Sequence, residues 1–326
     1  MTFKAFRVYV EDGIRRGVET MTEDQLPEGE VLIRVHYSSL NYKDALSSNG
    51  NKGVTRNYPH TPGIDAAGIV EDSQSPKWKK GDAVIVTGFD LGMNTHGGLS
   101  EYIRVPADWV IKCPEGLSLR EAMCYGTAGF TAALSVDKIV SNLKPEDGKI
   151  LVTGATGGVG SVAVAFLSKL GYTVLAATGK AEVAEYLKKL GAAEIVGREV
   201  IDDQSGKPML KPLWAGAVDT VSGNTLTTAI KAAAYGGHVT CCGNVSAGDF
   251  QSSVYPFILR GVTLHGIDSV QCGMPIRERL WALMATDWKV PTIFEEAQEI
   301  TLDEVESVVE SLLAGKHKGR TIVKLP

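Results

Sequence analysis

Short apolar runs alternate with polar turn residues in the first third of the chain, and this pattern predicts β-strands. Segments 3–10, 29–40, 66–71 and 82–89 are rich in β-branched and aromatic residues. Glycine, proline and charged residues separate them, as is typical of strands joined by turns. We therefore expect an antiparallel, barrel-like β domain over residues 1–121.

After residue 120 the pattern changes to one in which strands and helices alternate. Residues 119–140 are rich in small residues and predict a helix. The strands that follow are expected at 149–153, 172–178, 193–197, 216–223 and 238–244, and the helices at 158–169, 180–191 and 224–237. Such alternation predicts a parallel sheet covered on both faces by helices. We place this doubly wound α/β domain at 122–260.

The last part of the chain, 261–326, is expected to complete the sheet edge and to return to the β domain. Residues 261–270 are strand-like, 274–286 and 301–316 are helical in pattern, and a final strand begins near residue 320.

Size and charge limit the partners that the chain can have. Its 326 residues are enough for two domains. A net charge of -5 gives no reason to expect nucleic acid or an anionic membrane as a partner. No apolar run approaches the roughly 20 residues that span a bilayer. The five cysteines form no CxxC pair, so we expect reduced thiols and a cytoplasmic protein.

A glycine loop follows the strand at 149–153. Residues 155–160 read ATGGVG, which matches the dinucleotide fingerprint GxGxxG except that its first glycine is Ala155. A strand, a tight turn and a helix start form the context that this Rossmann-type motif needs. Gly157 would let the backbone approach a pyrophosphate, and the helix start would favour the anion. The predicted contact residues are Thr156, Gly157, Gly158 and Val159. The alternative is a turn with packing duties only.

The end of the second strand indicates which dinucleotide binds. NAD sites usually carry Asp or Glu about 20 residues beyond the loop. Here Ala177 and Thr178 stand in that place, so no carboxylate repels a 2′-phosphate. We expect NADPH, held by Thr178, Gly179, Lys180 and Arg198. The alternative is that the two basic residues are solvated surface charges.

Six segments carry a family resemblance: SSLNYKDAL (38–46), PHTPGIDAAGIV (59–70), HGGLSEY (96–102), YGTAGFTAALSV (125–136), DTVSGN (219–224) and YPFILRGVTLHGIDSV (255–270). Together with the order of the domains they resemble the medium-chain dehydrogenase/reductase superfamily. They are most similar to its zinc-free quinone-oxidoreductase branch, in the YhdH/YhfP-type group that contains acrylyl-CoA reductases. The resemblance implies a Rossmann domain, a GroES-like catalytic β domain and an oxidoreductase.

The resemblance also implies an enzyme without a metal. Zinc-dependent members bind catalytic zinc with a Cys, the His of a Gly-His-Glu motif and a second Cys. The corresponding positions are Asn41, Ile64 and Thr127. Ile64 cannot bind zinc, and Asn41 and Thr127 are poor ligands beside thiolates. Alcohol oxidation, which relies on a Lewis acid, is therefore not expected.

Hydride transfer without a metal suits an acceptor that is already activated, such as an α,β-unsaturated thioester, an enone or a quinone. The resemblance implies that Tyr42 lies at the nicotinamide end of the cofactor, where its phenol can donate to an oxyanion or pass a proton. Asn41 is the second catalytic candidate, as a residue that positions the substrate. Gly243 and Asn244 end a predicted strand and are expected near the nicotinamide. Ser269 and Arg320 are carried over from the group as cofactor neighbours.

Three functions follow from this pattern. The first is an NADPH-dependent reductase of a small α,β-unsaturated acyl-CoA such as acrylyl-CoA. The second is an NADPH-dependent quinone or enone reductase, and the third is a non-catalytic NADPH-binding protein. The strand at 261–270 commonly pairs across a two-fold axis in this superfamily, so a homodimer is expected.

Overall fold

A computed structural model describes residues 1–180 and 183–326. Its contacts divide the chain into two units, which are described separately. Unit 1 comprises Met1–Thr127, Val270–Ala285 and Phe294–Pro326. Unit 2 comprises Ala128–Ser269 and Thr286–Ile293.

Unit 2 is built on a six-stranded parallel sheet, in agreement with the predicted doubly wound fold. Its strand order is β10-β9-β8-β11-β12-β13. The strands are β8 (Ile150–Val152), β9 (Val174–Ala177), β10 (Glu194–Val196), β11 (Trp214–Asp219), β12 (Ala233–Cys241) and β13 (Thr263–Gly266). Strands β9 and β10 follow β8 toward one edge of the sheet, whereas β12 and β13 follow β11 toward the other edge. The sheet therefore has a switch point between β8 and β11, where doubly wound proteins bind ligands.

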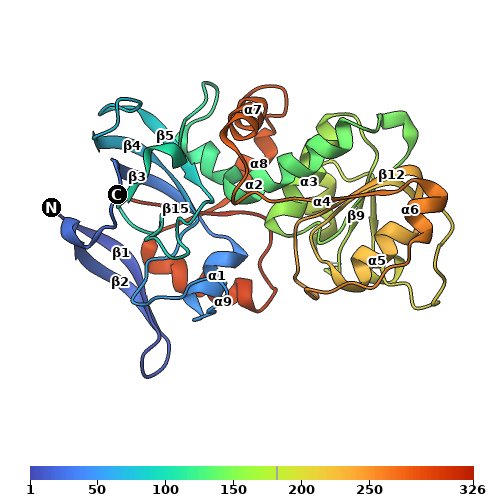
Figure 1. The fold of residues 1–326 in the computed structure, drawn as a ribbon, viewed down its shortest axis with the longest axis horizontal. Helices are drawn as coiled ribbons and strands as arrows, with labels where there is room; N and C mark the ends of the chain where they lie inside the picture. Colours follow the sequence, from blue (N-terminus) through green and yellow to red (C-terminus); the bar gives the residue numbers. More distant parts are fainter. Residues whose placement is uncertain (181–182) are drawn as a thin grey trace. The chain divides into compact units, whose positions relative to one another are not determined.

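Helices cover this sheet (Figure 1). They are α2 (Leu119–Val140), which begins in unit 1, α3 (Gly158–Lys169), α4 (Ala184–Lys189), α5 (Gly223–Lys231) and α6 (Tyr255–Arg260). Helix α3 packs on β8, β9 and β11, and α5 packs on β11 and β12. The bounds of α3 are those predicted. Residues 181–182 of the predicted helix 180–191 lie outside the described residues.

The predicted helix 224–237 is shorter in the structure. Helix α5 ends at Lys231, and β12 begins at Ala233. Ala233 lies opposite Trp214 of β11 in the sheet, and both are buried. The alanines at 232–234 favour a helix locally. Pairing with β11 instead places Ala233 and Ala234 in β12.

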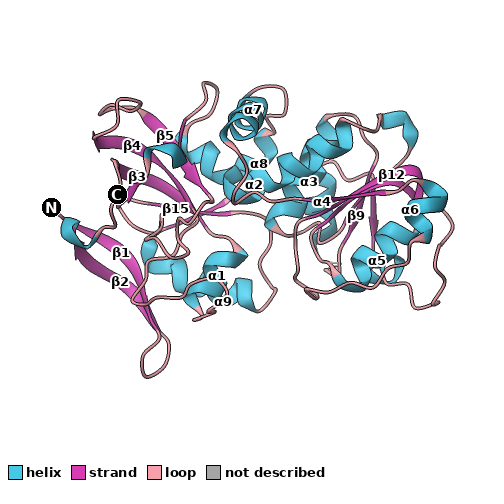
Figure 2. Cartoon of the chain, in the orientation of Figure 1, coloured by secondary structure: helices cyan, strands magenta, loops and turns pink. Residues whose placement is uncertain are grey.

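Unit 1 contains the predicted β domain (Figure 2), whose strands pair antiparallel except for β14, which runs parallel to β15. A two-stranded sheet is formed by β1 (Thr2–Tyr9) and β2 (Arg15–Thr22). The seven-stranded sheet has the order β14-β15-β3-β4-β5-β7, with β6 paired to β3. Its strands are β3 (Val31–Ser39), β4 (Asp65–Ser73), β5 (Ala83–Thr87), β6 (Tyr102–Val105), β7 (Val110–Lys112), β14 (Gln298–Ile300) and β15 (Thr321–Lys324). Because β15 pairs with β3, the end of the chain completes the seven-stranded sheet of unit 1.

The remaining helices are short. The α-helices are α1 (Tyr42–Ser48), α7 (Met274–Ala285), α8 (Pro291–Glu296) and α9 (Val305–Leu313). Single 3-10 turns occur at Glu23–Gln25, Ala107–Trp109, Pro145–Asp147, Arg198–Ile201 and Leu302–Glu304. Among the described residues, no helix is both long enough and apolar enough to cross a membrane.

Candidate active site

The glycine loop of unit 2 has the geometry of a phosphate-binding turn. Gly157 is the N-cap residue of α3, so the free N–H groups of the first helical turn face away from the helix body. A Cβ on Gly160 would collide with the carbonyl of Gly154 and lie 2.8 Å from Cα of Ala155. Gly160 therefore lets the helix pack closely on the turn, which is the usual role of the third glycine of this motif.

The alanine in place of the first glycine is explained by its neighbour. Gly154 has φ +56°, in the left-handed region, whereas Ala155 is not among the described residues with positive φ. The tight turn is made one residue earlier than the aligned motif predicts. Since glycine enters this region without strain, Ala155 does not impair the loop.

A buried carboxyl group, that of Asp219, supports the loop from the end of β11. Its Oδ1 accepts a hydrogen bond of 2.7 Å from the hydroxyl of Thr153, and its Oδ2 accepts one of 2.8 Å from the N–H of Ser222. Burial raises the pKa of Asp219. Sequence reasoning assigned no role to this residue, although the segment DTVSGN contains it.

One cavity of unit 2, of about 690 Å³, lies at the ends of β9 and β10, and Thr178, Gly179 and Arg198 line it. The N–H of Lys180 donates to the hydroxyl of Thr178 over 3.1 Å, which closes the turn after β9. A Cβ on Gly179 would lie within the guanidinium of Arg198, 2.6 Å from Cζ. The structure therefore brings together the residues predicted to select the cofactor, and Glu199 joins them on the cavity wall.

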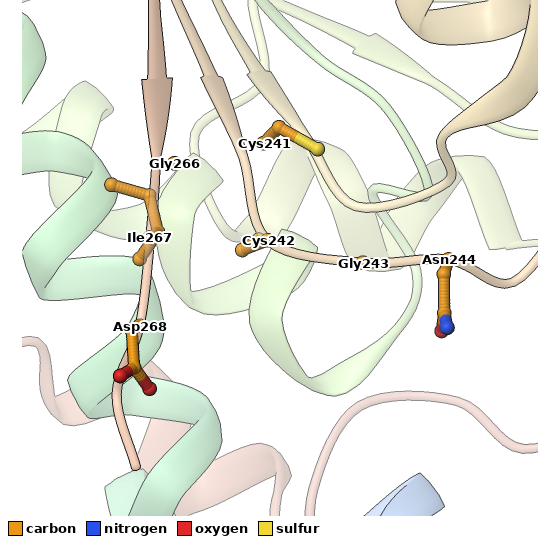
Figure 3. A pocket seen from close by; sticks show the side chains of 7 residues that line it. All are labelled: Cys241, Cys242, Gly243, Asn244, Gly266, Ile267 and Asp268. Atoms are coloured by element: carbon orange, nitrogen blue, oxygen red, sulfur yellow. The ribbon is translucent and has the colours of Figure 1, made fainter. Parts of the chain in front are cut away.

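A second cavity of unit 2, of about 670 Å³, lies at the ends of β12 and β13. Figure 3 shows Asn244 on the segment after β12 and Asp268 on the segment after β13, with Gly243 between Cys242 and Asn244. A Cβ on Gly243 would collide with the carbonyl of Thr220, so this position requires glycine. Asp268 was not predicted as a site residue, although it stands next to Ser269.

The other predicted residues at this end of the sheet are close by in the chain. The hydroxyl of Thr131 donates to that of Ser269 over 2.8 Å. Burial raises the pKa of the Cys242 thiol to about 12, and it also raises the pKa of Cys241. Neither thiol is therefore a thiolate nucleophile at neutral pH.

The two cavities lie on opposite sides of the switch point, with the glycine loop between them in the strand order. An extended dinucleotide needs this arrangement: a pyrophosphate site at a helix start and a pocket at each side. The glycine loop and the Arg198 cavity fit a dinucleotide phosphate by their backbone geometry and their charge.

Unit 1 holds the predicted catalytic residues at the start of α1. Asn41 is the N-cap residue, and Tyr42, the first helical residue, is 40% exposed. The amide of Asn41 is in contact with three charged groups. Its Nδ2 donates to Asp65 over 2.7 Å and to Asp44 over 3.3 Å, and its Oδ1 accepts from Arg320 over 3.3 Å.

Arg320 is buried in unit 1, where its guanidinium donates to two backbone carbonyls as well as to side chains. The carbonyls are those of Cys124 and Leu40, at 3.0 and 3.2 Å. The structure thus places Arg320 beside Asn41, and its role as a cofactor neighbour stays a prediction.

The positions that correspond to zinc ligands do not fit zinc. Ile64 presents a buried apolar side chain. The amide of Asn41 is engaged as described, and the hydroxyl of Thr127 donates to Asp65 over 2.6 Å. No group of three or more His, Cys, Asp or Glu side chains is arranged to hold a metal ion within residues 1–180 and 183–326.

Asp44 is a second buried carboxyl group beside this network. Its Oδ2 accepts from the N–H of Asn41, and its Oδ1 accepts from the N–H groups of Gly63 and Ile64, at 2.8, 3.1 and 2.9 Å. Burial, followed by the charge of Asp65, raises the pKa of Asp44 to about 7. Sequence reasoning did not identify this group.

The chain matches two family models and is similar to several oxidoreductases. Residues 27–115 match the alcohol dehydrogenase GroES-like domain, and residues 158–286 match the zinc-binding dehydrogenase domain. The chain is 47% identical to YhfP of Bacillus subtilis, a candidate quinone oxidoreductase, over 96% of each chain. It is 43% identical to the acrylyl-CoA reductase AcuI of Ruegeria pomeroyi, over 94% of this chain and 93% of the relative.

Solved structures agree with these matches. The crystal structure of the YhdH oxidoreductase from Salmonella enterica, in complex with NADP, has a TM-score of 0.96 at 42% identity and covers 99% of this chain and 100% of its own. The structure of Bacillus subtilis YhfP with NAD bound has a TM-score of 0.96 at 46% identity and full coverage of both chains.

Proposed function

Because this chain belongs to the medium-chain dehydrogenase/reductase superfamily, in its zinc-free group of YhdH and YhfP type, we propose that it is an NADPH-dependent reductase of a small α,β-unsaturated acyl-CoA. Acrylyl-CoA is the named candidate. The reaction adds a hydride to the β-carbon and a proton to the α-carbon of the thioester, while NADPH becomes NADP⁺.

The observation that carries this proposal is the chemistry of Asn41, Ile64 and Thr127. In the zinc-dependent members a Lewis acid stabilises the charge on the oxygen of a ketone or alcohol substrate, and these three residues are not a ligand set for zinc. An α,β-unsaturated thioester needs only hydrogen-bond donors for the enolate that forms after hydride addition. The 43% identity to an acrylyl-CoA reductase supports the same substrate class.

We assign the cofactor to unit 2. Thr156, Gly157, Gly158 and Val159 would hold the pyrophosphate through backbone N–H groups. Thr178, Gly179, Lys180 and Arg198 would hold the 2′-phosphate, and Gly243, Asn244 and Ser269 would contact the nicotinamide end. A bound reduced nicotinamide supplies the hydride. A relative of this group binds NADP and another binds NAD, and the cation of Arg198 in place of a carboxylate favours NADPH here.

Tyr42 and Asn41 would act on the substrate. The phenol of Tyr42 would donate a hydrogen bond to the thioester oxygen, where charge develops as the hydride adds. Asn41 would position the substrate from the start of α1. Arg320 would lie near the cofactor, as the resemblance to the group implies. The exposure of Tyr42 at the first position of α1 supports its role.

A quinone or enone reductase is the alternative, and the identity to YhfP favours it. Both functions use the same cofactor and the same hydrogen-bond donor. They differ in the acceptor. A non-catalytic NADPH-binding protein is a third, more distant possibility for the same glycine loop.

An assay with several acceptors tests these functions. Purified protein with NADPH would be given acrylyl-CoA, a simple quinone, or no acceptor. We expect turnover of acrylyl-CoA well above that of the quinone, and the reverse order would favour the alternative. Tight NADPH binding with no turnover of either would support the binding protein. Stoichiometric zinc in the purified protein would contradict the metal-free assignment.

We also propose that the protein is a cytoplasmic homodimer. Strand β13 is the edge of its sheet, and α6, just before it, exposes Ile258 and Leu259. An open edge beside exposed apolar residues suits pairing with a second copy. We expect light scattering to report a dimer, and the double variant Ile258→Glu/Leu259→Glu to weaken it. Ile276→Glu, an exposed apolar residue of α7, is the matched control. A monomeric wild type would contradict the proposal.

A further inference from the structure

We propose that Asp65 is a positioning residue of the reductase, and that its buried carboxylate holds Asn41 and the start of α1 so that Tyr42 is presented in one orientation. Hydrogen bonds to Asp65 would thus organise the region that zinc organises in metal-dependent relatives. This inference rests on the proposed role of Tyr42. It adds Asp65, a residue that the proposed function does not include.

The carboxylate of Asp65 accepts hydrogen bonds from two separate segments of the chain, residues 39–41 and Thr127. The hydroxyl of Ser39, at the end of β3, donates over 2.5 Å, and Nδ2 of Asn41 donates over 2.7 Å. Thr127 donates twice, through its N–H at 2.9 Å and its hydroxyl at 2.6 Å. Asp65 itself is fully buried. A buried carboxylate that accepts so many hydrogen bonds fixes the positions of its partners.

A break in helix α2 allows the N–H and hydroxyl groups of Thr127 to reach Asp65. Gly126 has φ 53° and ψ -155°, which interrupts the helical conformation inside α2. A Cβ at this position would lie 2.5 Å from both Asp65 Oδ2 and Ser39 Oγ, and 2.9 Å from Nη2 of Arg320. The break and its glycine therefore let the backbone of α2 turn its N–H toward the carboxylate.

Arg320 fixes the polarity of the network. Its Nη2 lies 4.0 Å from Asp65 Oδ2 and donates to the hydroxyl of Ser39 over 2.8 Å. Ser39 and Asn41 therefore each accept from the guanidinium and donate to the carboxylate. If the amide of Asn41 were reversed, its NH₂ would face a cation and its oxygen would face an anion. The charge pair thus allows one orientation of Asn41.

Asn41 transmits this orientation to Tyr42. The backbone carbonyl of Asn41 accepts the first hydrogen bonds of α1, from the N–H groups of Asp44 and Ala45, at 3.0 and 3.3 Å. Helix α1 has seven residues, too few to be stable without tertiary contacts. The helix start, and with it the first helical residue, Tyr42, is therefore set by the network around Asp65.

Removal of the negative charge is expected to loosen this arrangement without removing a residue of the proposed cofactor site in unit 2. In Asp65→Asn an NH₂ group would face at least one of the present donors. Small displacements of a catalytic group lower the rate strongly, by up to about 100-fold per ångström. We therefore expect kcat to fall at least about tenfold, with the Kd for NADPH within about threefold of the wild type.

A double-mutant cycle with Tyr42→Phe separates positioning from a general structural role. If Asp65 acts through Tyr42, then Asp65→Asn/Tyr42→Phe has a kcat within about twofold of the slower single variant. Asp72→Asn is the matched control, because Asp72 is an exposed carboxylate on the same strand, and it should keep the wild-type rate. A fall of kcat by the product of the two single effects, or a wild-type rate for Asp65→Asn, would overturn the inference.

A milder variant keeps the test valid if Asp65→Asn does not fold. Thr127→Val removes one hydroxyl donor and retains the backbone N–H, and we expect a fall of a few-fold in kcat that is again non-additive with Tyr42→Phe. Additive effects would count against positioning. The proposed function fails in a different way: the wild type would not reduce acrylyl-CoA, or Tyr42→Phe alone would retain the full rate.

Discussion

The guanidinium of Arg198 lies directly over Gly179, so that a Cβ on this glycine would be 2.6 Å from Cζ of the arginine. The glycine follows the second strand of the sheet, β9, and the arginine follows the third, β10. Their close approach puts a positive charge near the place where NAD-binding Rossmann domains usually carry a carboxylate. Two predictions about cofactor choice follow from this pair.

Replacement of Arg198 by glutamine should reduce selectivity for NADPH. A hydrogen bond to a charged group contributes about 1.5–3 kcal/mol, so kcat/KM for NADPH should fall about 10- to 100-fold while kcat/KM for NADH changes little. Steady-state kinetics with both cofactors measure this. Lys169→Gln removes the same charge from an exposed position at the end of α3 and should change neither value. Equal losses for NADPH and NADH would contradict a 2′-phosphate contact.

Addition of a methyl group at Gly179 should displace Arg198. In Gly179→Ala the guanidinium must move, because the new Cβ occupies its place. We expect a several-fold loss of kcat/KM for NADPH with little change in melting temperature, since the arginine can swing outward. Gly248→Ala, at a position where a Cβ meets nothing within 4 Å, is the control in the same unit. An unchanged preference for NADPH would show that this contact plays no part in selection.

Gly126→Ala should destabilise the protein. The substitution forces a Cβ into a left-handed backbone position, which costs about 1–3 kcal/mol, and places it against Asp65, Ser39 and Arg320. Urea unfolding should report a loss of at least about 2 kcal/mol. Gly17→Ala, in open space on β2, should cost much less. A similar stability for both variants would argue against a strained break.

Acid should destabilise unit 1 through one buried imidazole, that of His60, and one half-buried imidazole, that of His96. Burial lowers the pKa of His60 to about 4 and that of His96 to about 3. Below pH 6.5 the unfolded histidines take up protons that the folded ones do not. Each histidine therefore makes the free energy of unfolding fall by about 1.4 kcal/mol per pH unit as pH decreases from 6.5 toward 4.

A comparison of slopes isolates this effect. The raised pKa of Asp44 acts in the opposite sense, because its stabilising effect is present below pH 3.8 and is lost as pH rises through about 7. His60→Gln should therefore be compared with the wild type by urea unfolding at several pH values. A variant slope smaller by about 1.4 kcal/mol per pH unit is expected, and equal slopes would show that His60 is not neutral in the folded state.

Local patterns predicted the elements whose residues follow one period over a whole segment. Helix α3 begins and ends where its glycines and apolar positions predict. The alanines at 232–234 were misread as helix, because alanine favours a helix wherever no partner strand competes. The partner here is β11, which the order of residues in this segment does not reveal.

The sequence by itself determined the class of fold, the glycine loop and the missing carboxylate at Ala177, since each depends on residue types at short or fixed spacings. The resemblance to the zinc-dependent dehydrogenases implied the loss of the zinc ligands. Only the tertiary structure decided what replaces those ligands. Ser39, Asn41, Asp65, Thr127 and Arg320 meet around one buried carboxylate. These residues come from distant parts of the chain. Arg320 and Asp65 form a charge pair only because the fold buries both of them together, and no local pattern encodes this.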